Sequence, residues 1–142
     1  MGARSWVPAA CLLAFSASQV VACGDDSGGG GSADPRAIAT FQVTEEHGET
    51  FRVELTSPEL IDNARKLLAG DEAPSIPVGK VVRGDPDGVN SPWGWHIDPG
   101  TVEFADVTTE VCDGLPSDVE KDIITSPLYC PWSAKLIDLQ VS

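Results

Sequence analysis

From residue 39 to residue 55 the chain reads ATFQVTEEHGETFRVEL, and this stretch decides the fold. Apolar and polar residues alternate from Ala39 to Val43 and again from Phe51 to Leu55, which is typical of strands with one buried face. The polar residues 45–49 between them are suited to a turn. We therefore expect two half-buried strands paired as an antiparallel hairpin.

A helix is expected directly after the hairpin. Ser57 is a good N-cap, Pro58 suits the first helical turn, and Gly70 is a frequent helix terminator. Between them, apolar residues recur at helical spacing at positions 60, 61, 64, 67 and 68.

Strands dominate the rest of the chain. The apolar side of residues 102–112 changes midway, as an extra residue in a bulged strand would cause. A capping box at Ser117–Glu120 opens a short second helix, which ends before Pro127. We expect further strands at 76–83, 93–97, 102–112 and 134–141. This order predicts an α+β fold with two helices and a mainly antiparallel sheet of about six strands.

The first 22 residues have the features of an export signal. Arg4 precedes an apolar stretch, Trp6–Phe15, that is too short to span a membrane. Residues 20–23, VVAC, are similar to the lipobox of bacterial lipoproteins. This similarity implies cleavage before Cys23, a diacylglycerol group on its sulfur and a fatty acid such as palmitate on the new amine, which together anchor a protein stably. The alternative is an ordinary secreted protein whose signal ends in cysteine.

The residues after the signal predict a tether and one domain. Cys23 is followed by a Gly/Ser/Asp-rich spacer, so we divide the chain into a signal at 1–22, a lipidated tether at 23–36 and a globular domain at 37–142. Gly24 stands where inner-membrane lipoproteins carry a retention aspartate. We therefore expect an extracytoplasmic, lipid-anchored protein of the cell envelope, in the outer membrane if the cell is Gram-negative.

The four cysteines have three different fates. Cys11 leaves with the signal and Cys23 takes the lipid, so Cys112 and Cys130 remain in an oxidising compartment. Neither has the close spacing of zinc-binding cysteine pairs. We expect one disulfide, Cys112–Cys130.

Charge limits the partners of the chain. It has 9 basic and 22 acidic residues, a net charge of −13, and an apolar content of 42% that is typical of a folded domain. Phosphate backbones and anionic headgroups repel such a protein. We expect no nucleic-acid partner, and contact with the membrane only through the lipid on Cys23.

Residues 84–112 contain the densest group of candidate site residues. Residues 98–101, DPGT, suit a type II turn, and a tight hairpin around it would place His96 opposite Glu103. The pair is then either a functional dyad for proton transfer or metal ligation, or a structural pair that braces the hairpin. We favour the bracing role, because the chain has only one other histidine.

The two tryptophans beside His96 also allow two interpretations. Trp93 and Trp95 are core residues or, if exposed, a platform for a sugar, a peptide or an aromatic ligand. Asp113 faces the same region or serves only its own turn. The sequence therefore predicts a ligand site formed by Trp93, Trp95, His96, Asp98, Glu103 and Asp113.

Other chemistry has weaker support. Residues 85–90, DPDGVN, offer oxygen ligands for calcium, but Pro86 and Gly88 depart from an EF-hand loop, and a plain turn is favoured. The chain has no GxSxG, HExxH, P-loop or dinucleotide motif. We expect no enzymatic activity, no metal site and no cofactor.

Two motifs together resemble a known family. WGWHIDP at 93–99 and CDGLPSDVE at 112–120, supported by FQV at 41–43, resemble the N-terminal domain of a slime-mould calmodulin-binding protein, a family found also in small exported bacterial proteins. The resemblance spans 37–142 and implies little chemistry. Calmodulin is not expected as a partner, because it binds basic helices and the helix at 58–69 has mixed charge.

These observations predict an exported bacterial lipoprotein with a small acidic domain that binds an unknown small molecule or protein. The first alternative is a metal-binding envelope domain for Ca²⁺ or Zn²⁺ that uses His96 and Glu103. The second is a hydrolase with His96 as the general base.

Overall fold

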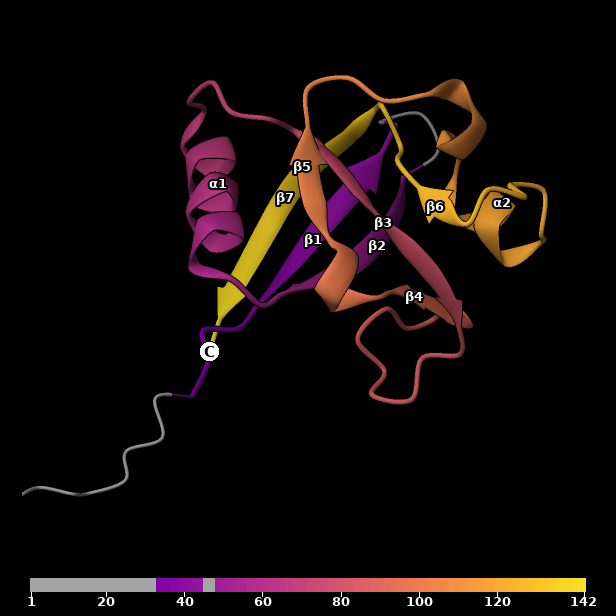
Figure 1. Ribbon diagram of the computed structural model, residues 1–142, viewed down its shortest axis with the longest axis horizontal. Helices are drawn as coiled ribbons and strands as arrows, with labels where there is room; N and C mark the ends of the chain where they lie inside the picture. Colours follow the sequence, from indigo (N-terminus) through magenta and orange to yellow (C-terminus); the bar gives the residue numbers. More distant parts are fainter. Residues whose placement is uncertain (1–32, 45–47) are drawn as a thin grey trace, which may run out of the picture. The chain divides into compact units, whose positions relative to one another are not determined.

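The computed structural model describes residues 33–44 and 48–142 (Figure 1). The expected signal, the lipidation site Cys23, most of the tether and residues 45–47 of the first turn lie outside these residues. Within the described ranges, no helix is both long enough and apolar enough to cross a membrane.

Three strands form the first sheet. β1 (Ala37–Val43) lies between β2 (Glu49–Leu55) and β7 (Ala134–Val141), and both pairs are antiparallel. The predicted hairpin and the predicted last strand are confirmed. In Figure 1, β7 (yellow) lies beside β1 (indigo), so the two ends of the domain share one sheet.

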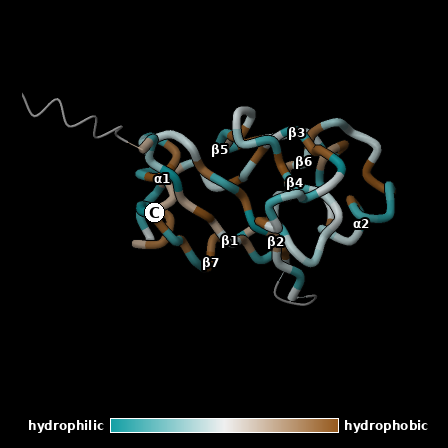
Figure 2. Tube along the Cα trace, turned by 90° about the horizontal axis from the view of Figure 1, so that it is seen from below, coloured by the Kyte–Doolittle hydropathy of each residue, from teal (hydrophilic) through white to brown (hydrophobic). Residues whose placement is uncertain are grey.

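Apolar and polar side chains alternate along these strands, so the apolar side chains lie on one buried face of the sheet. Phe41 on β1 and Phe51 on β2 are opposite each other in the register and stack with ring centroids 5.4 Å apart. Figure 2 shows hydrophobic and hydrophilic residues alternating along the same strands. The other face carries polar side chains, among them Arg52 and Glu54, which become important for the site.

α1 (Pro58–Ala69) is confirmed at both ends. The Ser57 hydroxyl accepts a hydrogen bond from the backbone N–H of Leu60, and Gly70 has a φ of 82°, in the left-handed region that favours glycine. Its buried side chains are Ile61 and Ala64.

β3 (Ile76–Arg83) organises the second sheet. It pairs antiparallel with β4 (Trp95–Ile97), β5 (Glu103–Ala105) and β6 (Leu128–Tyr129). β5 pairs with its start, β6 with its middle and β4 with its end. A Cβ at Gly79 would overlap the side chain of Ile97, so only glycine fits at the centre of this strand.

The expected hairpin between residues 93–97 and 102–112 is wrong. β4 and β5 do not pair with each other; both pair with β3, so that His96 is opposite Val82 and Glu103 is opposite Val78. The physical reason is the turn between them. Residues 99–101 form a short 3₁₀ turn that leads the chain away from a hairpin, so both segments pair with β3.

That turn is the 3₁₀ helix η1 (Pro99–Thr101) and not a type II turn. The Asp98 carboxylate accepts a hydrogen bond from the N–H of Gly100 at 3.0 Å, and the Thr101 hydroxyl accepts one from the N–H of Lys80 on β3. These two bonds stabilise the tight turn against β3.

The strand expected at 102–112 is shorter in the structure. β5 ends at Ala105 because its partner there, Ile76, is the first residue of β3. The chain then turns outward, with Val107 83% exposed, and forms the 3₁₀ helix η2 (Glu110–Cys112). The expected disulfide Cys112–Cys130 is confirmed and links η2 to the segment after β6.

α2 (Pro116–Glu120) begins earlier than the expected capping box. Its N-cap is Leu115, whose backbone N–H donates to Asp118 Oδ2. Ser117, the expected cap, instead donates its N–H to Glu49 Oε2 on β2. The cap moves because Pro116 takes a place in the first turn.

An aromatic group fills the core shared by the two sheets. Trp95 and Tyr129 are fully buried and meet edge-on, with ring centroids 5.4 Å apart, and Phe51 meets Tyr129 at 5.2 Å. The α+β class with antiparallel sheets, two helices and one disulfide is confirmed. The described residues form seven strands, in sheets of three and four, and the sequence does not predict the short β6.

Tyr129 gives this core a pH dependence. It is the only tyrosine of the chain, and its hydroxyl donates to the Gly114 carbonyl at 3.0 Å. Burial, and then the negative charge of Asp113, raises the pKa of Tyr129 far above its ordinary value. The folded state therefore favours the neutral phenol, so this contribution to stability is complete below about pH 10 and is lost as the pH rises further.

We predict that the tyrosine absorbance change, measured against pH, coincides with loss of the circular dichroism signal. Ionisation near pH 10 in a protein that is still folded would contradict the burial of this hydroxyl.

Candidate functional site

A hydrogen bond between its imidazole and a backbone carbonyl orients His96 on β4. Its Nδ1 lies 2.6 Å from the carbonyl oxygen of Gly84, just after β3. A carbonyl oxygen only accepts, so Nδ1 carries the proton and donates. The other nitrogen of the neutral ring, Nε2, is then an acceptor. The half-buried ring lines a pocket.

Asn90 holds the loop that forms one wall of this pocket. Its side chain is fully buried: Oδ1 accepts from the N–H of Arg52 on β2 at 2.7 Å, and Nδ2 donates to the carbonyl of Trp95 on β4 at 2.9 Å. Asp85 Oδ2 accepts from the N–H of Asn90. One amide group therefore joins the first sheet to the second and fixes the loop between them.

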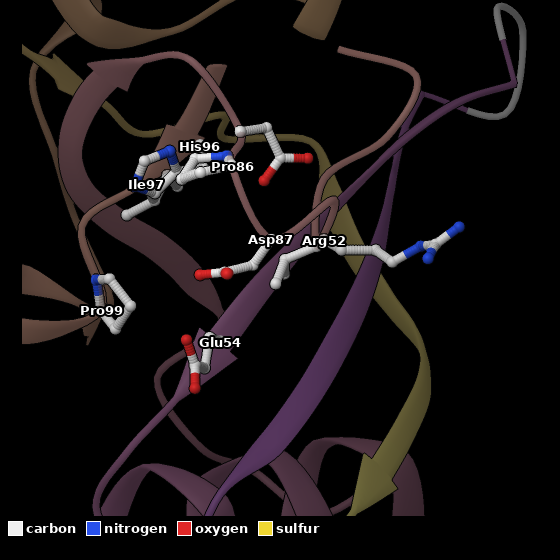
Figure 3. A pocket seen from close by; sticks show the side chains of 9 residues that line it. Arg52, Glu54, Pro86, Asp87, His96, Ile97 and Pro99 are labelled. Carbon is white, nitrogen blue, oxygen red and sulfur yellow. The ribbon is translucent and has the colours of Figure 1, made fainter. Parts of the chain in front are cut away.

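The pocket has a volume of about 90 Å³. Figure 3 shows the Glu54 and Asp87 carboxylates and the His96 ring on one side, with Pro99 beside them, while the guanidinium of Arg52 points away. Apolar side chains complete the lining, from Pro86, Val89, Ile97 and Pro99.

Acceptors dominate the polar lining of the pocket. The lining carboxylates are those of Glu54, Asp85 and Asp87. Glu54 also pairs with Arg36 at 3.2 Å, and Asp85 is engaged by Asn90. Within the described residues, Asp87 forms no ion pair. With Arg52 turned away, these groups suit a ligand that donates hydrogen bonds and carries positive charge.

The two tryptophans of the expected site do not face this pocket. Trp95 is fully buried beside Phe51 and Tyr129, which agrees with the core role among the two interpretations that the sequence allows. Trp93 is half-buried, and its indole N–H donates to the carbonyl of Thr50 at 2.8 Å. This bond ties the loop to β2, and Trp93 does not line the pocket.

The expected carboxylates do not line the His96 pocket either. Glu103 is exposed on β5 and does not line the pocket, so the expected His96–Glu103 pair is wrong. Asp98 caps η1, and Asp113 Oδ1 accepts from the N–H of Trp132 at 2.8 Å. Of the six expected ligand residues, the structure brings only His96 to this pocket.

Sequence reasoning does not identify Glu54 and Asp87 as neighbours of His96. Glu54 is one of the polar residues in the alternation of β2, a pattern that says only that it points away from the core. Asp87 lies in the 85–90 turn, where the sequence favours a plain turn over a calcium loop. Glu54 and Asp87 come together because Asn90 holds the loop against β2 and β4. Nothing in the polar sequence of this turn indicates that its asparagine is buried.

The described residues contain no group of three or more His, Cys, Asp or Glu side chains placed to hold a metal ion. Calcium or zinc therefore has no coordinating cluster in residues 33–44 and 48–142.

The comparison with family models gives the class of this protein. A family model described as the BP-74 N-terminal domain matches residues 37–141, and the chain belongs to this family. The resemblance carried by the motifs at 93–99 and 112–120 is thereby confirmed. No curated protein and no solved structure gives a significant match.

The orientation of His96 predicts an unusual tautomer. We expect the neutral ring to carry its proton on Nδ1, because Gly84 offers only an acceptor at that nitrogen. Nitrogen NMR of the imidazole at alkaline pH measures this, and a His47→Gln variant assigns the signals of the two histidines. A proton on Nε2 of His96 would show that the bond to Gly84 is not formed.

Proposed function

We propose that this protein is a lipid-anchored protein of the bacterial cell envelope whose domain binds a small organic cation in the pocket around His96. The observation that carries the proposal is the set of acceptors, Glu54, Asp87 and His96 Nε2, around one small cavity. Binding of this kind needs no catalytic group.

The anchor is supported by the order of features at the N-terminus. An apolar export signal, the lipobox-like VVAC ending at Cys23 and a Gly-rich spacer follow one another before the domain. A domain held in this way stays near the membrane without binding the lipid surface itself, since the chain has a net charge of −13 and anionic headgroups repel it.

A short alkylammonium or guanidinium group matches the pocket. Its N–H groups donate to Glu54, Asp87 and His96 Nε2, and hydrogen bonds to charged groups contribute about 1.5–3 kcal/mol each. Its stem packs on the apolar walls, such as Pro99. A volume of about 90 Å³ restricts the ligand to a few heavy atoms.

Binding is favoured over the two alternatives. A metal ion needs several ligands at short distance, and no such group occurs in the described residues. A hydrolase with His96 as general base needs a nucleophile or an activated water, and the pocket lining contains no Ser, Thr or Cys side chain. The acceptor set therefore supports ligand binding most directly.

The anchor predicts where the fatty acid is attached. In cells labelled with radioactive palmitate, we expect the Cys23→Ser variant to lose the label and the Cys11→Ser variant to keep it, because Cys11 leaves with the signal. Mass spectrometry of the mature N-terminal peptide locates the modification. An unmodified mature protein, or one that begins elsewhere than Cys23, would contradict the lipoprotein assignment.

The pocket predicts selective binding of an ammonium group. We expect n-propylammonium to bind the unacylated Cys23→Ser protein and to shift the NMR signals of His96, whereas uncharged 1-propanol does not. Glu54→Gln together with Asp87→Asn should weaken binding about a hundredfold or more, since each of the two lost charge-assisted bonds is worth at least about 1.4 kcal/mol, a factor of about ten.

Glu103→Gln together with Asp138→Asn is the matched control. It removes the same charge at two exposed residues that do not line the pocket, and it should change the affinity less than twofold. Equal losses in the two double variants would show that net charge, and not this pocket, attracts the cation.

A further inference from the structure

A second hollow region shares no lining residue with the His96 pocket. It consists of three adjoining hollows of about 590, 150 and 250 Å³. The first two share Asp106, and the first and third share Leu67 and Ser75. We call the three together the acidic groove. Its continuity suits a chain-like ligand better than a compact small molecule.

The acidic groove lies where three parts of the fold meet. Its walls are the end of α1 with the following residues 71–75, the residues just after β5, and the start of β7. Figure 1 shows these parts at the upper end of the view. The groove exists because β5 ends at Ala105, where β3 begins, and residues 106–108 turn outward.

Negative charge dominates the acidic groove. Asp71, Glu72 and Asp106 line it, against the single cation Lys135. In the part of the chain that the structure describes, none of these three carboxylates forms an ion pair. The C-terminal end of α1 reaches the same groove at Leu67 and adds the negative end of a helix dipole.

Trp132 ends the groove with an exposed aromatic face. Its side chain is 43% exposed, yet its backbone is fixed: the N–H donates to Asp113 Oδ1 at 2.8 Å, and Cys130 in the disulfide lies two residues before it. A tryptophan whose backbone is already held loses little backbone entropy on binding. Its face attracts cations, such as the side chains of Lys and Arg.

We propose that the acidic groove binds an extended basic peptide segment of a partner protein. The carboxylates of Glu72 and Asp106 receive its cationic side chains, and the aliphatic stems of those side chains pack on apolar surface such as Leu67 and Val107. Trp132 takes one Lys or Arg at the end of the segment. Charge complementarity favours this occupant over an anionic lipid surface, which the three carboxylates repel.

The test measures binding of hexalysine to the unacylated Cys23→Ser protein by isothermal titration calorimetry at low salt. We expect Glu72→Gln with Asp106→Asn to weaken binding at least about tenfold, and Trp132→Ala to weaken it further. Glu103→Gln with Asp138→Asn removes equal charge outside the groove and should have less than a twofold effect. Circular dichroism checks that each variant is folded.

Three outcomes would overturn the proposal. They are equal losses in the two double variants, unchanged affinity in Trp132→Ala, and tighter binding of chitotriose or of phosphatidylglycerol vesicles than of hexalysine. The double variant Glu72→Gln with Asp106→Asn should still bind n-propylammonium, because both substitutions lie outside the His96 pocket. A failure of peptide binding in the acidic groove can therefore be told apart from a failure of cation binding in the His96 pocket.

Discussion

The pairing of β3 with both β4 and β5 is the constraint on which the rest of the structure depends. It separates His96 from Glu103 by placing them opposite Val82 and Val78, at different parts of one strand. It also directs the 84–94 loop back onto β2, where Asn90 fastens it. The pocket with Glu54 and Asp87 is a consequence of this arrangement, as is the early end of β5 that leaves room for the acidic groove.

The many carboxylates of this chain have two kinds of role. Several stabilise the fold by accepting backbone N–H groups near α2 and its neighbours: Asp118 accepts from Leu115, Glu49 from Ser117, and Glu120 from Gly94 at 3.0 Å. The motif at 112–120 is thus largely explained by structure. In the part of the chain that the structure describes, Asp87 in the His96 pocket and Asp71, Glu72 and Asp106 in the acidic groove form no ion pair, and these two sites are where we propose that cations bind.

Local signals made much of the fold predictable. The β1–β2 hairpin, α1 with its caps Ser57 and Gly70, and the disulfide all follow from patterns within a short stretch or from the number of cysteines. The site was less predictable because it is made by tertiary contacts. Alternation marks Glu54 only as pointing away from the core, and it gives no sign that Trp95 is fully buried while Trp132, after Pro131, is exposed.

His96 lies beside Val82 of β3 and not beside Glu103, and both the pocket and its acceptor chemistry depend on this register. Cross-strand nuclear Overhauser effects between backbone protons test this register directly. We expect contacts between β4 and β3 in the Val82–His96 register, and between β5 and β3 in the Val78–Glu103 register. Contacts between the backbones of His96 and Glu103 would establish the simple hairpin and contradict the account.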